Sequence, residues 1–200
     1  WLLTADYKEI DQEPLIFETL KYIDGTTFVS VLDAFSIERN ADPFDRKVYA
    51  DQQPVETAEI WGASSIFTTT ISGIDITNIT SYREHDYFNR TDTDRSALSW
   101  LYDGDPETAQ RFSNEFRLNW SSGDLDWILG TYYYDQEASN LSFIEIGSDL
   151  ADLLGAPEAA GGRSGSDARM DTRSIAAFVS MTWNISEILD VTLGARYTDE

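Results

Sequence analysis

The side chains that could do chemistry in this chain are mostly carboxylates. Asp103, Asp105 and Glu107 stand at alternate positions, and Asp92 and Asp94 lie a short distance upstream. Oxygen ligands in such a group could hold a hard cation such as Ca²⁺ on a loop. The segment lacks the D-x-[DN]-x-[DN]-G order with a distant Glu that defines an EF-hand loop. Ordinary solvated carboxylates are therefore the favoured interpretation, and we expect no metal site.

Residues for catalysis or zinc binding are sparse. The chain has one histidine, His85, and no cysteine, whereas a zinc-type site needs several such ligands. His85 is expected to be an ordinary surface or interior histidine. The sequence contains no G-x-S-x-G motif, phosphate-binding glycine loop or dinucleotide fingerprint. Among 36 Asp and Glu residues chance carboxylate pairs are expected, and we predict neither an enzymatic activity nor a cofactor.

Composition narrows the class of protein. The formal net charge of −22 argues against nucleic acid as a partner, because phosphate would be repelled. The absence of cysteine excludes a disulfide framework and fits a bacterial envelope protein. No stretch approaches the ~20 consecutive apolar residues of a membrane helix. The chain begins at Trp1 rather than Met and stops after a strand-like run, so we expect a fragment of a longer chain.

Strand-type alternation is the main structural signal. Between residues 111 and 120 one face carries Phe112, Phe116, Leu118 and Trp120. After the turn at 121–124, the next segment places Leu125, Trp127, Leu129, Thr131 and Tyr133 on one face. This arrangement predicts a tight hairpin with one apolar face.

The same design recurs along the chain and predicts seven strands and very little helix. The expected strands are 1–10, 59–71, 74–88, 111–121, 124–137, 173–185 and 189–200. Short turns are expected near 72–73, 121–124 and 186–188, and long polar loops at 11–58, 90–109 and 138–171. A short helix is expected within the last loop, from Ser148 to about Gly155.

The alternation of short and long connections predicts the architecture. Compact soluble domains rarely contain loops longer than ~12–15 residues, whereas outer-membrane barrels combine short periplasmic turns with long outer loops. We therefore predict an all-β, antiparallel up-and-down meander that forms part of a large transmembrane β-barrel. Trp120, Trp127 and Trp183 would be membrane-interface aromatics on the periplasmic rim. A soluble β-sandwich is the alternative fold.

Three segments also resemble a known family. "ITNITSYREHDY", "RFSNEFRLNW…GDLDWILGTYYYDQE" and "IAAFVSMTWNISEILDVTLGARYTDE" resemble consecutive strands of TonB-dependent outer-membrane receptors, in the order in which that family has them. The resemblance covers roughly residues 59–200, and residues 1–58 fit only loosely. It implies that residues 1–200 are a partial barrel domain that lacks the plug, the TonB-box segment and the closing C-terminal strand.

The resemblance also implies a function. Such receptors of Gram-negative bacteria take up a scarce ligand, such as an iron–siderophore complex, and are energised by the TonB complex, which this chain would reach through an N-terminal region that it lacks. Outer-membrane lipid would surround the barrel. A passive porin-like channel and a soluble carbohydrate-binding or adhesin module are the rival functions.

Two groups of side chains are candidates for a role in that function. The lumen-facing candidates are Arg83, Glu115, Arg117 and Arg196, on the polar faces of their strands. The candidates for ligand contact in the outer loops are the aromatic residues Trp100, Tyr102 and Phe143. In the competing interpretation, the first group only contacts water in the barrel interior, and the second group only packs within the loops.

Overall fold

The computed structural model describes residues 1–14, 21–39, 42, 44 and 47–200. Over these residues the chain forms one eight-stranded sheet in which every neighbouring pair is antiparallel. The strands are β1 (Leu2–Gln12), β2 (Val55–Ile71), β3 (Ile74–Asp92), β4 (Leu101–Gly104), β5 (Glu107–Ser122), β6 (Leu125–Ile146), β7 (Arg163–Ser186) and β8 (Leu189–Asp199). The all-β meander expected from the alternation is thereby confirmed. No helix within these residues is long and apolar enough to cross a membrane.

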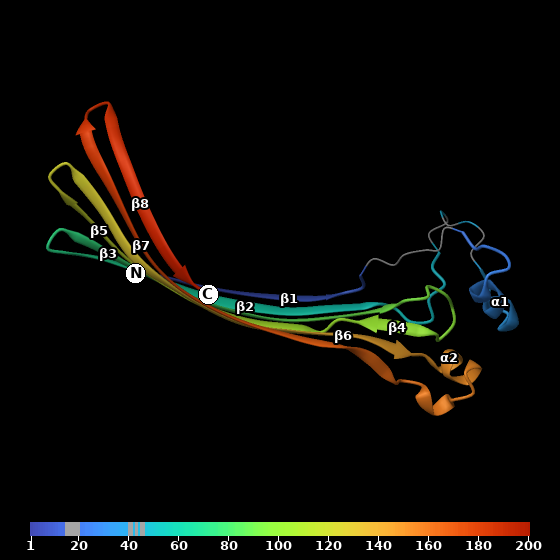
Figure 1. The fold of residues 1–200 in the computed structure, drawn as a ribbon. Coiled ribbons are helices and arrows are strands. Elements are labelled where there is room, and N and C mark those ends of the chain that lie inside the picture. The colour runs from blue at the N-terminus through green and yellow to red at the C-terminus, as the bar shows by residue number, and fades with distance from the viewer. Residues whose placement is uncertain (15–20, 40–41, 43, 45–46) are drawn as a thin grey trace.

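The sheet is a long, curved strip whose two ends differ in structure (Figure 1). The tips of the three tight hairpins lie at one end, and the helices α1 (Thr27–Ala34) and α2 (Ser148–Leu153) lie at the other. The first tip is the pair Ser72 and Gly73, both with positive φ, as a two-residue hairpin turn of the I′ type requires. The expected separation of short turns from long connections is therefore present.

The predicted limits of the long loops were too wide. β6 continues to Ile146 and β7 already begins at Arg163, so the connection is 147–162 rather than 138–171. The added strand segments mix polar and apolar side chains on both faces and so lack clear alternation, yet their backbones pair continuously from Asn140↔Ala168 to Glu145↔Arg163. The first connection is 13–54 rather than 11–58, and residues 15–20, 40, 41, 43, 45 and 46 within it lie outside the described part of the chain.

The predicted loop 90–109 is largely strand. β4 and β5 occupy one position in the sheet, since both pair with β3 on one side and β6 on the other in a single continuous register. Only Asp105 and Pro106 interrupt them, and proline cannot donate a ladder hydrogen bond. The eight strands consequently fill seven positions across the sheet, which matches the seven strands expected, with the fourth lengthened beyond its prediction.

Candidate functional site

One face of the sheet carries an apolar band, which is interrupted by a hydrogen-bonded polar cluster of Asn78, Thr80 and Asn114. On β5 it extends from Phe112 to Trp120, on β6 from Leu125 to Tyr133, and on β7 from Ile175 to Trp183. These stretches are each eight residue steps long, or about 26 Å at ~3.3 Å per residue. Within the described residues no second layer covers this band, and Leu193 on β8 is 63% exposed.

Aromatic side chains mark both borders of the apolar band. Near the hairpin tips, Trp120 and Trp127 face each other across β5 and β6 with ring centroids 5.9 Å apart and planes 8° apart. Trp183 lies beside them on β7, opposite Leu125. At the other border lie the ring pairs Trp61–Tyr82, at 5.1 Å, and Phe112–Tyr133, at 6.0 Å. The register places the three tryptophans expected at the membrane interface together near the hairpin tips, and their contact with a membrane stays a prediction. The sequence did not identify the second border.

The opposite face is polar and holds all four lumen-facing candidates. Arg117, Gly130, Phe178 and Arg196 follow one another as direct cross-strand partners from β5 to β8, and Arg83 and Glu115 share this face. Arg117 forms an ion pair with Glu115 at 3.0 Å. The guanidinium of Arg83 contacts Asp6 on β1 at 2.8 Å. The register thus places all four residues on one face, and the expectation that this face lines a lumen stays a prediction.

A close aromatic contact lies at the centre of the polar face. The ring of Phe178 lies against Gly130 so tightly that a Cβ at position 130 would come within 2.2 Å of it. The guanidinium of Arg196 lies 5.9 Å from the ring centroids of both Phe178 and Tyr132. Glycine at position 130 is therefore a packing requirement of this aromatic cluster rather than a requirement of backbone conformation.

At the end opposite the hairpin tips, the long connections meet in a polar network that we call the loop junction, consisting of Asp51, Asp92, Asp94, Ser96, Ser99, Tyr102 and Asp149. The Tyr102 hydroxyl donates to Asp51 and contacts the Ser99 hydroxyl at 2.9 Å. The Ser99 backbone N–H donates to Asp149 of α2 at 2.9 Å. The junction thus ties together segments from all three long connections.

Burial shifts the pKa values of several groups here. Burial, followed by repulsion from Asp94, raises the pKa of Asp92 to about 7. Burial and the hydrogen bond to Asp51 raise the pKa of Tyr102 to about 12. Although burial raises the pKa of Glu145, its hydrogen bonds from Arg163 and Arg90 outweigh that effect and lower it. The loop junction therefore contains a carboxyl group that titrates near neutrality.

The three aromatic candidates for ligand contact lie in different surroundings. Tyr102 belongs to β4 and Phe143 to β6, not to loops, and they are only 2% and 4% exposed. The guanidinium of Arg90 covers the Tyr102 ring at 4.4 Å, and that of Arg163 covers the Phe143 ring at 4.3 Å. Neither ring is accessible to a ligand in this arrangement, which corresponds to loop packing. Trp100 is half-buried, and its contact with a ligand stays a prediction.

Four of the five carboxylates considered for calcium, Asp92, Asp94, Asp103 and Glu107, have partners within the protein. Asp103 accepts hydrogen bonds from Thr91 at 2.7 Å and Thr93 at 2.9 Å, and Asp92 accepts from two backbone N–H groups. His85 lies 3.1 Å from Glu107 on the polar face. Among the residues that the structure describes, no group of three His, Cys, Asp or Glu side chains could hold a metal ion.

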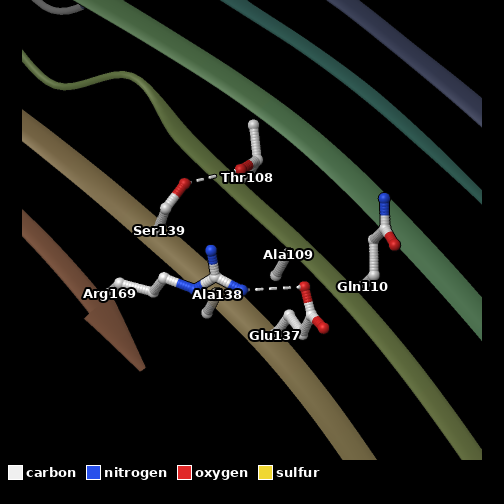
Figure 2. A pocket seen from close by; sticks show the side chains of 7 residues that line it. All are labelled: Thr108, Ala109, Gln110, Glu137, Ala138, Ser139 and Arg169. Atoms are coloured by element: carbon white, nitrogen blue, oxygen red, sulfur yellow. Dashed lines mark hydrogen bonds and ion pairs between the residues drawn. The ribbon is translucent and has the colours of Figure 1, made fainter. Parts of the chain in front are cut away.

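A shallow groove lies where the apolar band ends, between β5 and β6, and sequence reasoning did not identify it. Figure 2 shows its upper part, where Thr108 contacts Ser139 and Arg169 reaches across to Glu137. A second hollow, lined by Tyr82, Phe112, Tyr133 and Asp135, shares Gln110 and Glu137 with the first. Only the cross-strand register brings these residues together, so a search for local motifs could not find the groove.

Comparison with known proteins gives no relative: no family model, curated protein or solved structure matches the chain.

Proposed function

We propose that this chain is part of the wall of a transmembrane β-barrel in the outer membrane of a Gram-negative bacterium. The observation that carries the proposal is the uncovered apolar band of about 26 Å, bordered by aromatic rings and backed by a polar face. An outer-membrane barrel presents to lipid a band ~25 Å tall with aromatic girdles at both interfaces. The polar face would line the lumen.

The register of the hairpins supports a barrel wall. The last β5 residue paired with β3 is Asn119, and the last β7 residue paired with β6 is Trp183, yet these strands continue to Ser122 and Ser186. β3 itself begins one residue before its pair with Asn119, at Ile74, so the second and third hairpins extend two and three residues, about 7 and 10 Å, beyond their predecessors over two strand spacings of ~4.8 Å. That stagger corresponds to a strand tilt of about 35–45°, the tilt of barrel strands. Figure 1 shows the tips fanned out at one end.

Within the barrel proteins, the resemblance of three segments favours a TonB-dependent receptor. Such a receptor would take up a scarce ligand, such as a ferric siderophore, with energy from the TonB complex. Arg83, Glu115, Arg117 and Arg196 would contact a plug or line the transport path. The long connections, held together at the loop junction, would form the outer mouth.

The two rival functions make different demands. A passive porin-like channel would share the wall and the band, but its transport would not depend on TonB. A soluble β-sandwich would bury Phe116, Leu118, Val191 and Leu193 between two sheets. In the described residues these side chains lie on the uncovered face of a single sheet, and Phe116 and Val191 are 37% and 38% exposed. This observation argues against the sandwich.

A spin-label scan along β7 tests the membrane proposal. Because residues 1–200 contain no cysteine, single cysteines can be introduced at successive positions from Ala177 to Thr182 without replacing any other residue of this segment. The full-length protein in lipid vesicles is expected to show high oxygen accessibility at 177, 179 and 181, and high accessibility to a water-soluble nickel chelate at 178, 180 and 182. Uniform accessibility to the chelate along the strand would overturn the proposal.

A separate measurement tests the transport class. Uptake of a labelled ferric siderophore by cells that express the full-length protein is expected to stop when the TonB gene is deleted. Uptake that continues unchanged in the deletion strain would identify a passive channel instead.

A further inference from the structure

The groove between β5 and β6 consists of two adjoining hollows. The lower hollow lies at the border of the apolar band, and the upper hollow lies farther along the strands, away from the hairpin tips. Its lower hollow has a volume of about 250 Å³ and lies over the rings of Tyr82, Phe112 and Tyr133. Its upper hollow, of about 220 Å³, lies among Thr108, Ser139 and Arg169. The groove thus joins an aromatic floor to a strip of hydrogen-bonding side chains.

The side chains of the groove suit a neutral polyhydroxylated ligand. Rings present flat apolar faces, and Asp135, Glu137 and Gln110 add carboxylate and amide groups that accept or donate hydrogen bonds. The Gln110 amide makes no hydrogen bond to any other described side chain and is exposed. It therefore has its full donor and acceptor capacity available to a ligand.

The local charges disfavour an anionic ligand. Two of the three cations near the groove pair with carboxylates: Arg169 lies 3.2 Å from Glu137 and 3.1 Å from Asp171, and Arg173 lies 3.3 Å from Asp135. The third, Arg111, lines the lower hollow, but the strand alternation puts it on the opposite face from Gln110 and Phe112. On the adjoining β3, Glu84 adds a further negative charge on the same face. A phosphate in the groove would have to compete with these carboxylates, whereas sugar hydroxyls could donate to them.

We propose that this groove binds the sugar headgroup of a neutral membrane glycolipid. The inference rests on the proposed membrane function, because the occupant's acyl chains would lie along the apolar band beside Phe116 and Leu129. The continuity of the groove with that band favours a lipid-anchored sugar over a free one. An aromatic floor at the border places the sugar ring at the depth where a headgroup meets the acyl region.

Native mass spectrometry of the full-length protein in detergent micelles tests the proposal, with added monoglucosyl diacylglycerol as the probe. The expected result is binding of this lipid in preference to the same diacylglycerol without the sugar. Gln110→Ala is expected to weaken binding about fivefold or more, the effect of losing hydrogen bonds worth ~1 kcal/mol. Gln136→Ala is the matched control, because Gln136 lies on the polar face of β6 and is expected to leave binding unchanged.

The outcomes separate this proposal from the proposed function. Equal binding to wild type and Gln110→Ala, or equal binding of the sugar-free lipid, would overturn the glycolipid site. Equally tight binding of free glucose would overturn the lipid-anchored occupant. In each case the alternating accessibility of β7 in vesicles would still stand if the barrel proposal is correct. Loss of that alternation would instead mean that the membrane proposal itself had failed.

Discussion

Trp120 and Trp127 stack face to face across the tip of the β5–β6 hairpin, with ring centroids 5.9 Å apart and planes inclined by 8°. They are direct cross-strand partners, so the hairpin register itself brings the two rings together. The stacked pair forms the border of the apolar band at the end where the chain turns. If the band faces lipid, this pair marks the depth at which the hairpin leaves the membrane.

A double-mutant cycle measures the contribution of this stack. Trp120→Ala and Trp127→Ala are each expected to destabilise the folded protein in vesicles, and their combined effect is expected to be smaller than the sum. The coupling energy should be about 0.5–1.5 kcal/mol, as for other aromatic pairs, measured by urea titration. Additive effects would show that the rings contribute separately. Trp61 and Tyr82, tilted at 46° and 5.1 Å apart, provide a comparison pair at the other border.

Charge placed on the two faces of β6 should have unequal effects. Leu129→Arg puts a cation in the apolar band and is expected to lower the free energy of unfolding in a bilayer by about 2–4 kcal/mol. Ile128→Arg, one position away on the polar face, is the matched control and should cost much less. Urea titration of both variants in vesicles provides the comparison. Equal losses would contradict the assignment of the faces.

Replacing Gly130 tests the aromatic cluster of the polar face. Gly130→Ala would place a Cβ 2.2 Å from the Phe178 ring, and such overpacking typically costs about 1–3 kcal/mol. Adding Phe178→Leu to Gly130→Ala should recover part of the loss, because the smaller side chain frees the space. If thermal unfolding shows no recovery in the double variant, the cost would have another origin.

The loop junction should respond to pH through Asp92. Its pKa is about 7 in the folded protein, against an ordinary value of 3.8, so the folded state keeps a proton that the unfolded state releases. The contribution to stability is full below about pH 4 and is lost as the pH rises towards 7. The protection factors of the amides in residues 93–106, which are the intrinsic exchange rates at each pH divided by the observed rates, are therefore expected to be higher at pH 5 than at pH 8.

Two variants isolate that carboxyl group. Asp92→Asn is expected to remove most of the pH dependence of the protection factors, because the amide oxygen can still accept from the backbone N–H groups of Asp94 and Arg95 without ionising. Asp167→Asn, at an exposed position on β7, should leave the dependence unchanged. A variant at Asp92 that keeps the full pH response would show that another group controls the junction.

The outlines of the sheet could be predicted because strand alternation and turn chemistry are local. The residues from Phe112 to Tyr133 carry their own period of two, and Ser72–Gly73 and Gly123 mark tight turns wherever the strands later lie. The same period puts Glu115 and Arg117 on the polar face of their own strand, whereas the face that they share with Arg83 and Arg196 is set by the cross-strand register. The alternation and the tight turns depend on residues within a few positions of one another, and so the sequence alone determined them.

Other properties depended on contacts between distant segments. The ends of β6 and β7 beyond the predicted strands pair with each other, and β4 takes the same position in the sheet as β5 because both pair with β3 and β6. Tyr102 and Phe143 became buried residues because Arg90 and Arg163 cover them. The near-neutral pKa of Asp92 and the groove at Gln110 arise in the same way. Burial, the charges around a side chain and the strand register all depend on residues that are distant in the sequence, and only the tertiary structure brings those residues together.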